Sequence, residues 1–301
     1  MNNDILFTIE NEELGYKTHP KPVIHVEKLT IEAGKLVIII GISGAGKSTL
    51  LETLGLMRNS VLNRKTGTGG ENIRYNSSIF LNKEDDGFVS LKDLWNRSGR
   101  AKINHIRKMH FSFIFQNTNL MPNFSIEENI LSMASIQNKY SSEELKKRFV
   151  ANTKEMGLPE DIFKNNPANI SGGQKQRAAF LRAILPDYTV LFGDEPTGNL
   201  DERFAEELMK KIQDSIKRNK ENSSNNNKTA ILVSHNIPLS LRFADKIVVL
   251  SKVKANEPPV INNNTIISKT KSNSWSYCKN TFNDEEVAGI IRELMYQNTM
   301  F

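Results

Sequence analysis

The sequence predicts an α/β fold built on a mainly parallel sheet, and two observations lead to this prediction. From residue 36 onwards, short apolar runs typical of buried strands alternate with segments of helical periodicity. This alternation is typical of a parallel sheet whose faces are covered by helices. In addition, residues 41–48 read GISGAGKS and stand directly between a predicted strand and a predicted helix. That arrangement is typical of a phosphate-binding loop.

The residue types of segment 41–48 suit an anion. Its three glycines let the backbone curl so that N–H groups point inward, and the following helix adds its positive N-terminal end. Lys47 is expected against the β- and γ-phosphates of a nucleoside triphosphate, and the Ser48 hydroxyl is expected to ligate Mg²⁺. The alternative is a glycine-rich turn that matches by chance. The apolar strand before the loop and the helical pattern after it favour phosphate binding.

Composition and charge limit the class of protein. The chain has 301 residues, of which 25% are charged and 38% hydrophobic, as expected for one large or two small globular domains. No apolar run approaches the roughly 18 residues of a membrane span, and no signal peptide is recognisable. The single cysteine, Cys278, excludes an internal disulfide framework and fits a reducing compartment. We therefore expect a cytoplasmic protein.

The net charge of +6 has two interpretations. It fits attraction to nucleic acid or to an anionic membrane, and it equally fits a slightly basic protein without such partners. The basic residues are spread out and no run of Lys and Arg is interleaved with aromatic residues. This distribution favours the second interpretation, so no nucleic-acid partner is expected.

The elements before residue 110 begin with β structure. Residues 5–10 and 23–31 predict strands, and Tyr16 between them either stacks on a nucleotide base or is an ordinary tyrosine. The strand 36–40 and the loop lead into a helix that runs to about residue 57. Residues 58–108 form a β-rich excursion with a weaker signal. Its expected elements are a flexible turn at 66–70, strands at 79–81 and 88–89, an acidic turn at 84–86 and a helix at about 91–108.

The later elements continue the alternation. Strands are expected at 111–116, 189–192, 229–234 and 246–250, and helices at 125–136, 141–156, 174–184, 202–218 and 238–243. Ser125 is the expected N-cap of one helix, and Ser141 or Ser142 that of the next. Residues 219–228 have a disorder-like composition. The tail, 252–301, predicts strands at 260–268 and 274–279 and an amphipathic helix at 284–297, which either packs on the fold or forms a partner surface.

Several predicted strands are followed by chemically useful residues. The phosphate loop follows one strand, and Gln116, the pair Asp194 and Glu195, and His235 follow three others. The carboxyl ends of parallel strands form the edge where open α/β sheets bind ligands, so these groups are expected to meet. A solvated acidic turn and a structural histidine are the alternatives, and the neighbouring phosphate loop favours a site.

Each of these groups suits one task at a nucleotide. Asp194 is suited to hold Mg²⁺ through a water, and Glu195 to polarise the attacking water. His235 is suited to bond the γ-phosphate or that water. Gln116 is suited to contact Mg²⁺ or the lytic water. The sequence thus predicts hydrolysis of the bound nucleotide.

Residues 169–177, NISGGQKQR, resemble the signature of the ATP-binding-cassette (ABC) ATPases, usually LSGGQ. The phosphate loop, Gln116, LFGDEPT at 191–197, GNLD at 198–201 and His235 occur in that family's order. The match spans about residues 16–250. The resemblance implies a P-loop NTPase fold with a mainly parallel core sheet, an N-terminal antiparallel β subdomain and a helical signature subdomain at about 117–185. It also implies an ATPase domain at 1–251 with an insertion within 58–108, and an extension at 252–301 of unknown role.

The resemblance further implies a head-to-tail dimer that holds two ATP molecules between its subunits. The signature residues of one copy would then contact the ATP of the other. The implied ATP-binding residues are Tyr16, Gly41, Ser43, Gly44, Ala45, Gly46, Lys47, Ser48, Thr49, Ser171, Gly172, Gly173 and Gln174. The implied catalytic residues are Gln116, Glu195 and His235, and the implied Mg²⁺ ligands are Ser48, Gln116 and Asp194.

Two stretches, FQNTNLMPNFS at 115–125 and EPTGNLD at 195–201, look like the lipoprotein-release, macrolide-export and cell-division branch of the family. This resemblance implies an ATPase subunit that drives a separately encoded membrane permease, held peripherally at the cytoplasmic face of the inner or plasma membrane. The substrate and the permease stay open. The alternative is a soluble ATPase of the same fold that regulates a ribosome or DNA process. It is disfavoured for two reasons. Ribosome-acting members usually carry two cassettes, whereas this chain has one. DNA-repair members carry a long coiled coil between the phosphate loop and the signature, and the separation here is too short for one.

Overall fold

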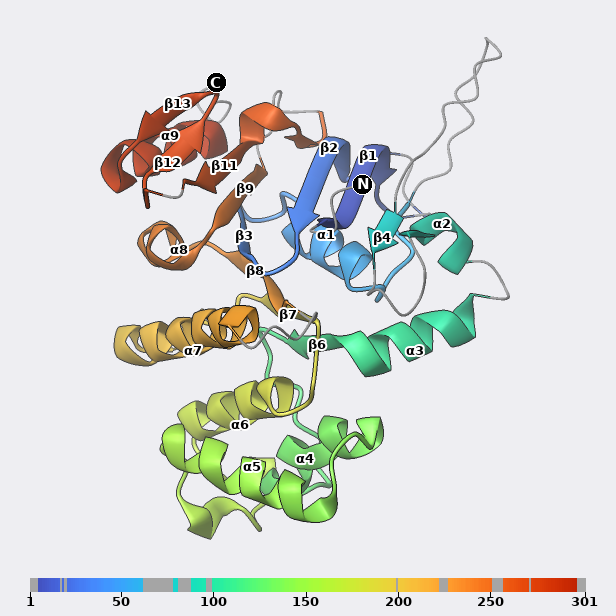
Figure 1. Cartoon of the computed structure of the whole chain (residues 1–301), viewed down its shortest axis with the longest axis vertical. Coiled ribbons are helices and arrows are strands. Elements are labelled where there is room, and N and C mark those ends of the chain that lie inside the picture. The colour runs from blue at the N-terminus through green and yellow to red at the C-terminus, as the bar shows by residue number, and fades with distance from the viewer. Residues whose placement is uncertain are drawn as a thin grey trace.

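The computed structural model describes residues 5–16, 18, 21–61, 78–80, 88–95, 99–198, 200–221, 227–250, 257–270 and 272–296. Along its long axis, two sheets and their helices occupy one end, and helices α4, α5 and α6 occupy the other (Figure 1). Helix α7 and strands β6 and β7 lie between the two ends.

The larger sheet has the strand order β13-β12-β11-β9-β3-β8-β7-β6. Strands β9, β3, β8, β7 and β6 run parallel. Strand β11 pairs antiparallel with β9, β12 with β11, and β13 with β12. The bounds are β3 Leu36–Gly41, β6 Phe111–Ile114, β7 Val190–Asp194, β8 Thr229–Ser234, β9 Lys246–Leu250, β11 Ile266–Lys269, β12 Trp275–Tyr277 and β13 Asn280–Phe282. The predicted α/β fold with a mainly parallel sheet is confirmed.

Strand β3 is apolar without alternation because both of its faces are buried. Leu36, Ile38 and Ile40 pack in one core with residues of the later helices. Val37 and Ile39 pack in a second core with the first helix and the smaller sheet. The helices concerned are α1 Lys47–Leu54, α7 Glu202–Glu221, α8 Ile237–Phe243 and α9 Asp284–Tyr296.

The smaller sheet is the expected N-terminal antiparallel layer, with the order β10-β2-β1-β4-β5. Its strands are β1 Ile5–Leu14, β2 Ile24–Glu32, β4 Ser78–Phe80, β5 Phe88–Ser90 and β10 Val260–Ile261. Strand β10 pairs parallel to β2, and the other pairs are antiparallel. The turns predicted at 66–70 and 84–86 lie outside the described residues.

The helical end confirms the predicted caps. It consists of α4 Ile126–Gln137, α5 Ser142–Glu155, the short turns η2 Glu160–Ile162 and η3 Pro167–Asn169, and α6 Gly172–Ile184. Ser125 and Glu128 form a capping box, and Ser141 rather than Ser142 caps α5. Helix α6 begins two residues earlier than predicted, since the Ser171 side chain accepts a bond from the backbone N–H of Gln174.

The single helix predicted at 91–108 is wrong. The structure has two helices there, α2 Leu91–Leu94 and α3 Arg100–His110. A Cβ atom built on Gly99 would lie only 2.0 Å from the carbonyl oxygen of Leu94. The chain therefore returns onto its own backbone at Gly99, a close approach that glycine alone permits.

The tail folds onto the larger sheet. The strand predicted at 260–268 is interrupted by the turn η4 Asn263–Thr265, and the strand predicted at 274–279 is part of the hairpin β12–β13. Strand β11 pairs with β9, and α9 buries Val287, Ile291 and Met295. The packing interpretation of this helix is confirmed.

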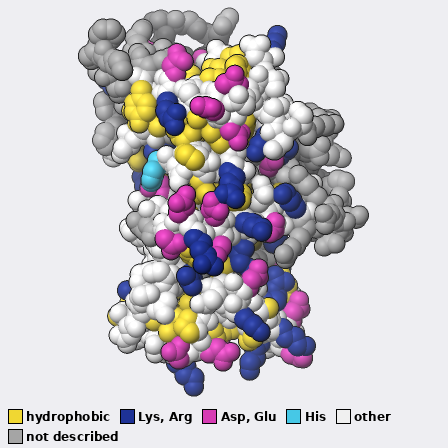
Figure 2. Space-filling view, turned by 90° about the vertical axis from the view of Figure 1, so that its left-hand side faces the viewer, with side chains coloured by type: hydrophobic (Ala, Val, Ile, Leu, Met, Phe, Trp, Pro, Cys, Tyr) yellow, Lys and Arg dark blue, Asp and Glu magenta, His cyan; other side chains and the backbone are white. Residues whose placement is uncertain are grey.

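On the face drawn in Figure 2, Lys and Arg side chains alternate with Asp and Glu side chains. Positive charge is therefore not gathered into one patch on that face. Among the residues that the structure describes, no helix combines the length and the apolar character needed to cross a bilayer.

Trp275 should anchor the tail. Its side chain is fully buried, and its indole Nε1 donates a 2.6 Å hydrogen bond to Oδ1 of Asp284. We expect Trp275→Ala to lower the free energy of unfolding by about 3–5 kcal/mol, because it empties a large buried site. Urea denaturation measures the change. Val150→Ala, at a side chain that is 47% exposed, is the control and should cost less than about 0.5 kcal/mol. A loss below about 1 kcal/mol for Trp275→Ala would contradict the anchoring role.

Candidate functional site

The phosphate loop leaves the end of β3 and enters α1 at Lys47. Gly44 and Gly46 have positive φ values of 74° and 91°, which glycine adopts without strain. At Gly46 a Cβ atom would also lie 2.7 Å from side-chain atoms of Val23 and Ile24. Gly46 is the N-cap of α1 and makes no side-chain cap bond, so the turn depends on backbone geometry alone.

Lys47 spans the mouth of this loop. Its side chain is buried, and its Nζ donates to the carbonyl oxygens of Gly41 at 3.0 Å and Ile42 at 3.1 Å. The ammonium group is therefore held over the curled backbone, where the phosphates of a nucleotide are expected. An anion placed there gains both this charge and the N-terminal end of α1.

Ser48 and Asp194 meet across the sheet edge. The Ser48 hydroxyl donates a 2.9 Å hydrogen bond to Oδ2 of Asp194. Burial raises the pKa of Asp194, the bond from Ser48 lowers it, and the neighbouring charge of Glu195 raises it again. A hydroxyl and a partly buried carboxylate are hard oxygen ligands, and a dication would offset the cost of burying the charge. The residues present thus fit Mg²⁺.

Glu195 occupies the centre of the site. Its Oε2 accepts a 3.2 Å hydrogen bond from Nε2 of Gln116, and its Oε1 lies 3.5 Å from Nδ1 of His235. Its φ of 46° is unusual for a residue other than glycine, and its N–H bonds the carbonyl of Val233 at 3.1 Å. Gln116 after β6 and His235 after β8 therefore meet the Glu195 carboxylate after β7, as the sequence predicted.

Gly193 before this acidic pair is explained by packing. A Cβ atom at Gly193 would lie 2.7 Å from Cδ2 of Leu232 on the neighbouring strand. Glycine at this position lets β7 and β8 lie close together behind the two carboxylates.

Tyr16 lies beside the first turn of α1. Its hydroxyl is hydrogen-bonded to Thr49 Oγ1 at 3.2 Å, and the guanidinium of Arg58 lies 5.0 Å from its ring centroid. Tyr16 is therefore adjacent to the phosphate loop, and base stacking by its ring stays a prediction. Sequence reasoning did not anticipate Arg58, because its distance along the chain gives no local signal.

The signature segment forms an exposed helix start. Ser171 and Gln174 form a capping box, in which the Ser171 N–H donates to the Gln174 side chain at 2.8 Å. A Cβ atom at Gly172 or Gly173 would meet no described atom within 4 Å. Packing against the described part of the chain therefore does not require glycine at these two positions. Their free backbone is open to contact from another molecule.

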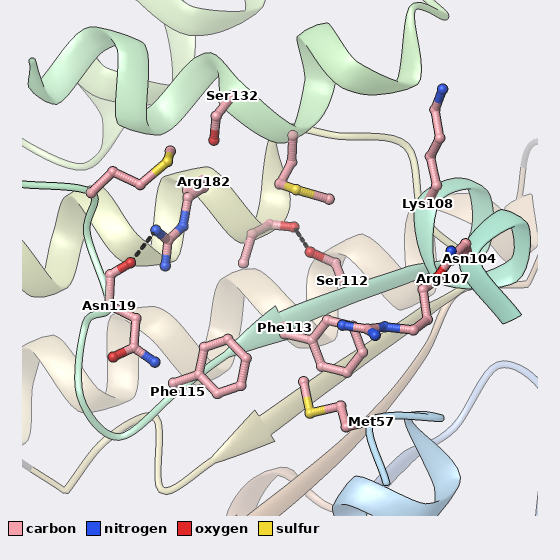
Figure 3. A pocket seen from close by; sticks show the side chains of 13 residues that line it. Met57, Asn104, Arg107, Lys108, Ser112, Phe113, Phe115, Asn119, Ser132 and Arg182 are labelled. Carbon is pink, nitrogen blue, oxygen red and sulfur yellow. Dashed lines mark hydrogen bonds between the residues drawn. The ribbon is translucent and has the colours of Figure 1, made fainter. Parts of the chain in front are cut away.

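A groove adjoins the site between β6 and helices α3, α4 and α6 (Figure 3). Its volume is about 480 Å³. The apolar lining side chains include Met57, Phe113, Phe115, Met121 and Met133, and the cationic ones are Arg107, Lys108 and Arg182. Phe115 is next to Gln116 in the chain, so the groove and the catalytic edge share one loop.

Comparison with known protein families gives a match to the ABC transporter family over residues 24–198. The chain is 34% identical to the lipoprotein-releasing system ATP-binding protein LolD of Cytophaga hutchinsonii over 222 residues, which are 73% of this chain and 86% of that protein. It is 30% identical to the bacitracin export ATP-binding protein BceA of Halalkalibacterium halodurans over 244 residues, 80% of this chain and 82% of that protein.

Among solved structures, the dimeric bacterial ABC transporter cassette MJ0796 superposes with a TM-score of 0.63 at 25% identity. The superposition covers 85% of this chain and 97% of that cassette.

The two constrained glycines give a test of the loop. Gly46→Ala introduces both an unfavourable φ and a clash with β2, whereas Gly44→Ala introduces the unfavourable φ alone. We expect Gly46→Ala to weaken ATP binding at least roughly tenfold more than Gly44→Ala. Titration with a fluorescent ATP analogue measures both affinities, and circular dichroism checks folding. Equal affinities would remove the steric argument for Gly46.

Proposed function

The chain belongs to the ABC transporter family, and on that basis we propose that two copies of it hydrolyse ATP between them to drive a membrane permease. The chain is an ATP-binding and ATP-hydrolysing subunit of this class. The residue assignment rests on the position of the Glu195 carboxylate. It accepts a hydrogen bond from Gln116 and lies beside His235, at the same sheet edge as the phosphate loop.

In the proposed assignment, the backbone of residues 41–46 and the Lys47 ammonium bind the β- and γ-phosphates. Ser48, Gln116 and Asp194 would hold Mg²⁺, which neutralises charge on the β- and γ-phosphate oxygens when bound. Lys47 would exchange its bonds to Gly41 and Ile42 for bonds to phosphate. Thr49 and Tyr16 would lie along the nucleotide beside the first turn of α1.

Glu195 is the proposed general base for the attacking water. Its carboxylate is already oriented by Gln116, so it needs little rearrangement to accept a proton. His235 would bond the γ-phosphate or the same water from the next strand. Burial raises the pKa of the adjacent Asp194 because it penalises the charged carboxylate, and bound Mg²⁺ would offset that penalty.

The second half of the nucleotide site would come from another copy of the chain. The exposed backbone at Gly172 and Gly173, in the first turn of α6, suits a phosphate anion. The relative MJ0796 was solved as a dimer, which supports the same arrangement here. Because ATP would contact both copies, its binding would stabilise the dimer.

A permease segment is the proposed occupant of the groove in Figure 3. The groove offers apolar side chains for burial and includes the cations Arg107 and Lys108 in its lining, so it suits an amphipathic helix with acidic residues. The relatives named for lipoprotein release and bacitracin export support a transport or extraction role. They do not favour the soluble regulatory alternative. The chain would then lie at the cytoplasmic face of the membrane through its permease.

The domain limits also stay proposals. We assign residues 1–251 to the ATPase domain, about 117–185 to its helical subdomain and an insertion to a part of 58–108. Residues 252–301 form the extension, and the described part of that extension packs on the core sheet.

Glu195→Gln tests the proposed base. The amide keeps the size of the side chain but accepts protons poorly, so kcat should fall about a hundredfold or more. ATP binding should persist and the dimer should accumulate, as size-exclusion chromatography with and without ATP and Mg²⁺ would show. Glu202→Gln on the exposed start of α7 is the matched control and should keep normal turnover. Unchanged turnover in Glu195→Gln would remove Glu195 from the base role.

Met133→Glu tests the proposed groove. A carboxylate among the apolar lining should reduce the permease recovered with the tagged chain from detergent-solubilised membranes about tenfold. Ile136→Glu is the control, since Ile136 lies on the same helix and is 54% exposed. Equal recovery with the two variants would place the permease contact elsewhere.

A further inference from the structure

Arg182 connects the helix that starts at the signature segment to the loop that carries Gln116. Its Nη1 donates to the carbonyl oxygen of Asn119 at 2.7 Å, and its Nη2 donates to the carbonyl oxygen of Thr118 at 2.7 Å. Figure 3 shows the guanidinium reaching from α6 to this loop across the wall of the groove. Within the described residues, Arg182 makes no ion pair with a carboxylate, so its donors are directed to backbone carbonyls. Such charge-assisted bonds in a fixed fork are stronger than neutral ones.

The loop needs this attachment because its own backbone does not hold it in a regular element. Asn119 adopts a positive φ of 46°, a left-handed conformation in which asparagine is common, so the chain turns here outside any helix or strand. The far end of the loop is fixed separately by Asn129, which is fully buried and whose Nδ2 donates to the carbonyls of Met121, Phe124 and Ser125. Among the described residues, Arg182 bonds the loop backbone at Thr118 and Asn119, close to Gln116, while Leu120 packs against the hydrophobic core.

The same helix carries both ends of the connection. Helix α6 begins with the Ser171 cap, and Arg182 lies about 16 Å further along it at the usual helical rise. A helix of this length moves as a rigid element. A displacement of its N-terminal end therefore moves the carbonyls of Thr118 and Asn119 with it, and Gln116 is only two residues before Thr118.

We propose that Arg182 is a positioning residue that holds Gln116 against Glu195 as long as α6 is in place, and so links the signature end of one chain to its own catalytic carboxylate. This inference rests on the proposed function, because it assigns Gln116 a part in hydrolysis. Arg182 and Asn119 also line the groove, so an occupant of the groove would lie against the same pair of hydrogen bonds.

Arg177 provides a matched comparison on the same helix. Its Nη1 also donates to two backbone carbonyls, those of Met156 and Gly157, each at 3.3 Å. Its guanidinium lies 4.7 Å from the ring centroid of Phe204. Arg177 thus joins α6 to the end of α5, and within the described part of the chain it makes no hydrogen bond to the loop after Gln116.

The test is a double-mutant cycle on the full-length chain, with kcat and KM for ATP measured for wild type, Arg182→Met, Gln116→Ala and the double variant. We expect Arg182→Met and Gln116→Ala to lower kcat by a similar factor, about fivefold or more, with KM changed less than about twofold. The double variant should be no slower than Gln116→Ala alone. Arg177→Met combined with Gln116→Ala should instead show independent, multiplied effects.

Several results would overturn the proposal. These are multiplied effects of Arg182→Met and Gln116→Ala, a rise in KM with normal kcat in Arg182→Met, and normal kcat in Gln116→Ala. Absence of turnover in the wild-type chain would instead reject the proposed function itself. If Arg182→Met does not fold, Arg182→Lys serves, because its ammonium reaches carbonyls without the fork. In Arg182→Lys, the backbone amides at 118–121 should exchange hydrogen faster than in the wild-type chain, while the amides of α6 stay protected. Exchange at 118–121 that equals that of the wild-type chain would overturn the proposal.

Discussion

Strands β9, β3, β8, β7 and β6 run in the same direction, and every group of the site depends on that alignment. Ile40 is level with Ser234, and Asp194 with Val233. The residues that follow these strands therefore leave the sheet at one height, which brings the phosphate loop, two carboxylates and a histidine together. The same register buries the strands on both faces, so the edge is held by two hydrophobic cores rather than by the polar groups it presents.

The polar edge itself is costly to fold. Two neighbouring carboxylates stand side by side, burial raises the pKa of Asp194, and Glu195 has a left-handed backbone conformation. Packed aromatic rings in the same sheet offset such costs: the ring of Phe192 lies 5.0 Å from that of Phe111 and 5.3 Å from that of Phe113. A site that is unfavourable by itself is in this way supported by rigid elements, which is how strained functional geometry persists.

The helical end is joined to this core through side chains that bond backbone groups. Gln137 is buried, and its Nε2 donates to the carbonyls of Lys108 and Asp187 while its Oε1 accepts from the N–H of Asp187. Arg182 bonds the loop after Gln116 from the same side. Such contacts add direction to the apolar packing that already joins α4 and α6 to the sheet. Because Arg182 bonds the loop itself, a change in the position of α6 would reach the backbone next to Gln116.

Local chemistry alone determined much of this protein. The apolar strands, the glycine turn before Lys47, the capping serines at 125 and 141, and the polar residues after each strand are short-range patterns with direct physical meaning. The tertiary structure decided what depends on distant segments: the helix break at Gly99, the pairing of β11 with β9, and the bonds from Arg182 to Thr118 and Asn119. Periodicity reports which face of an element is buried, but it does not report which distant backbone that face meets.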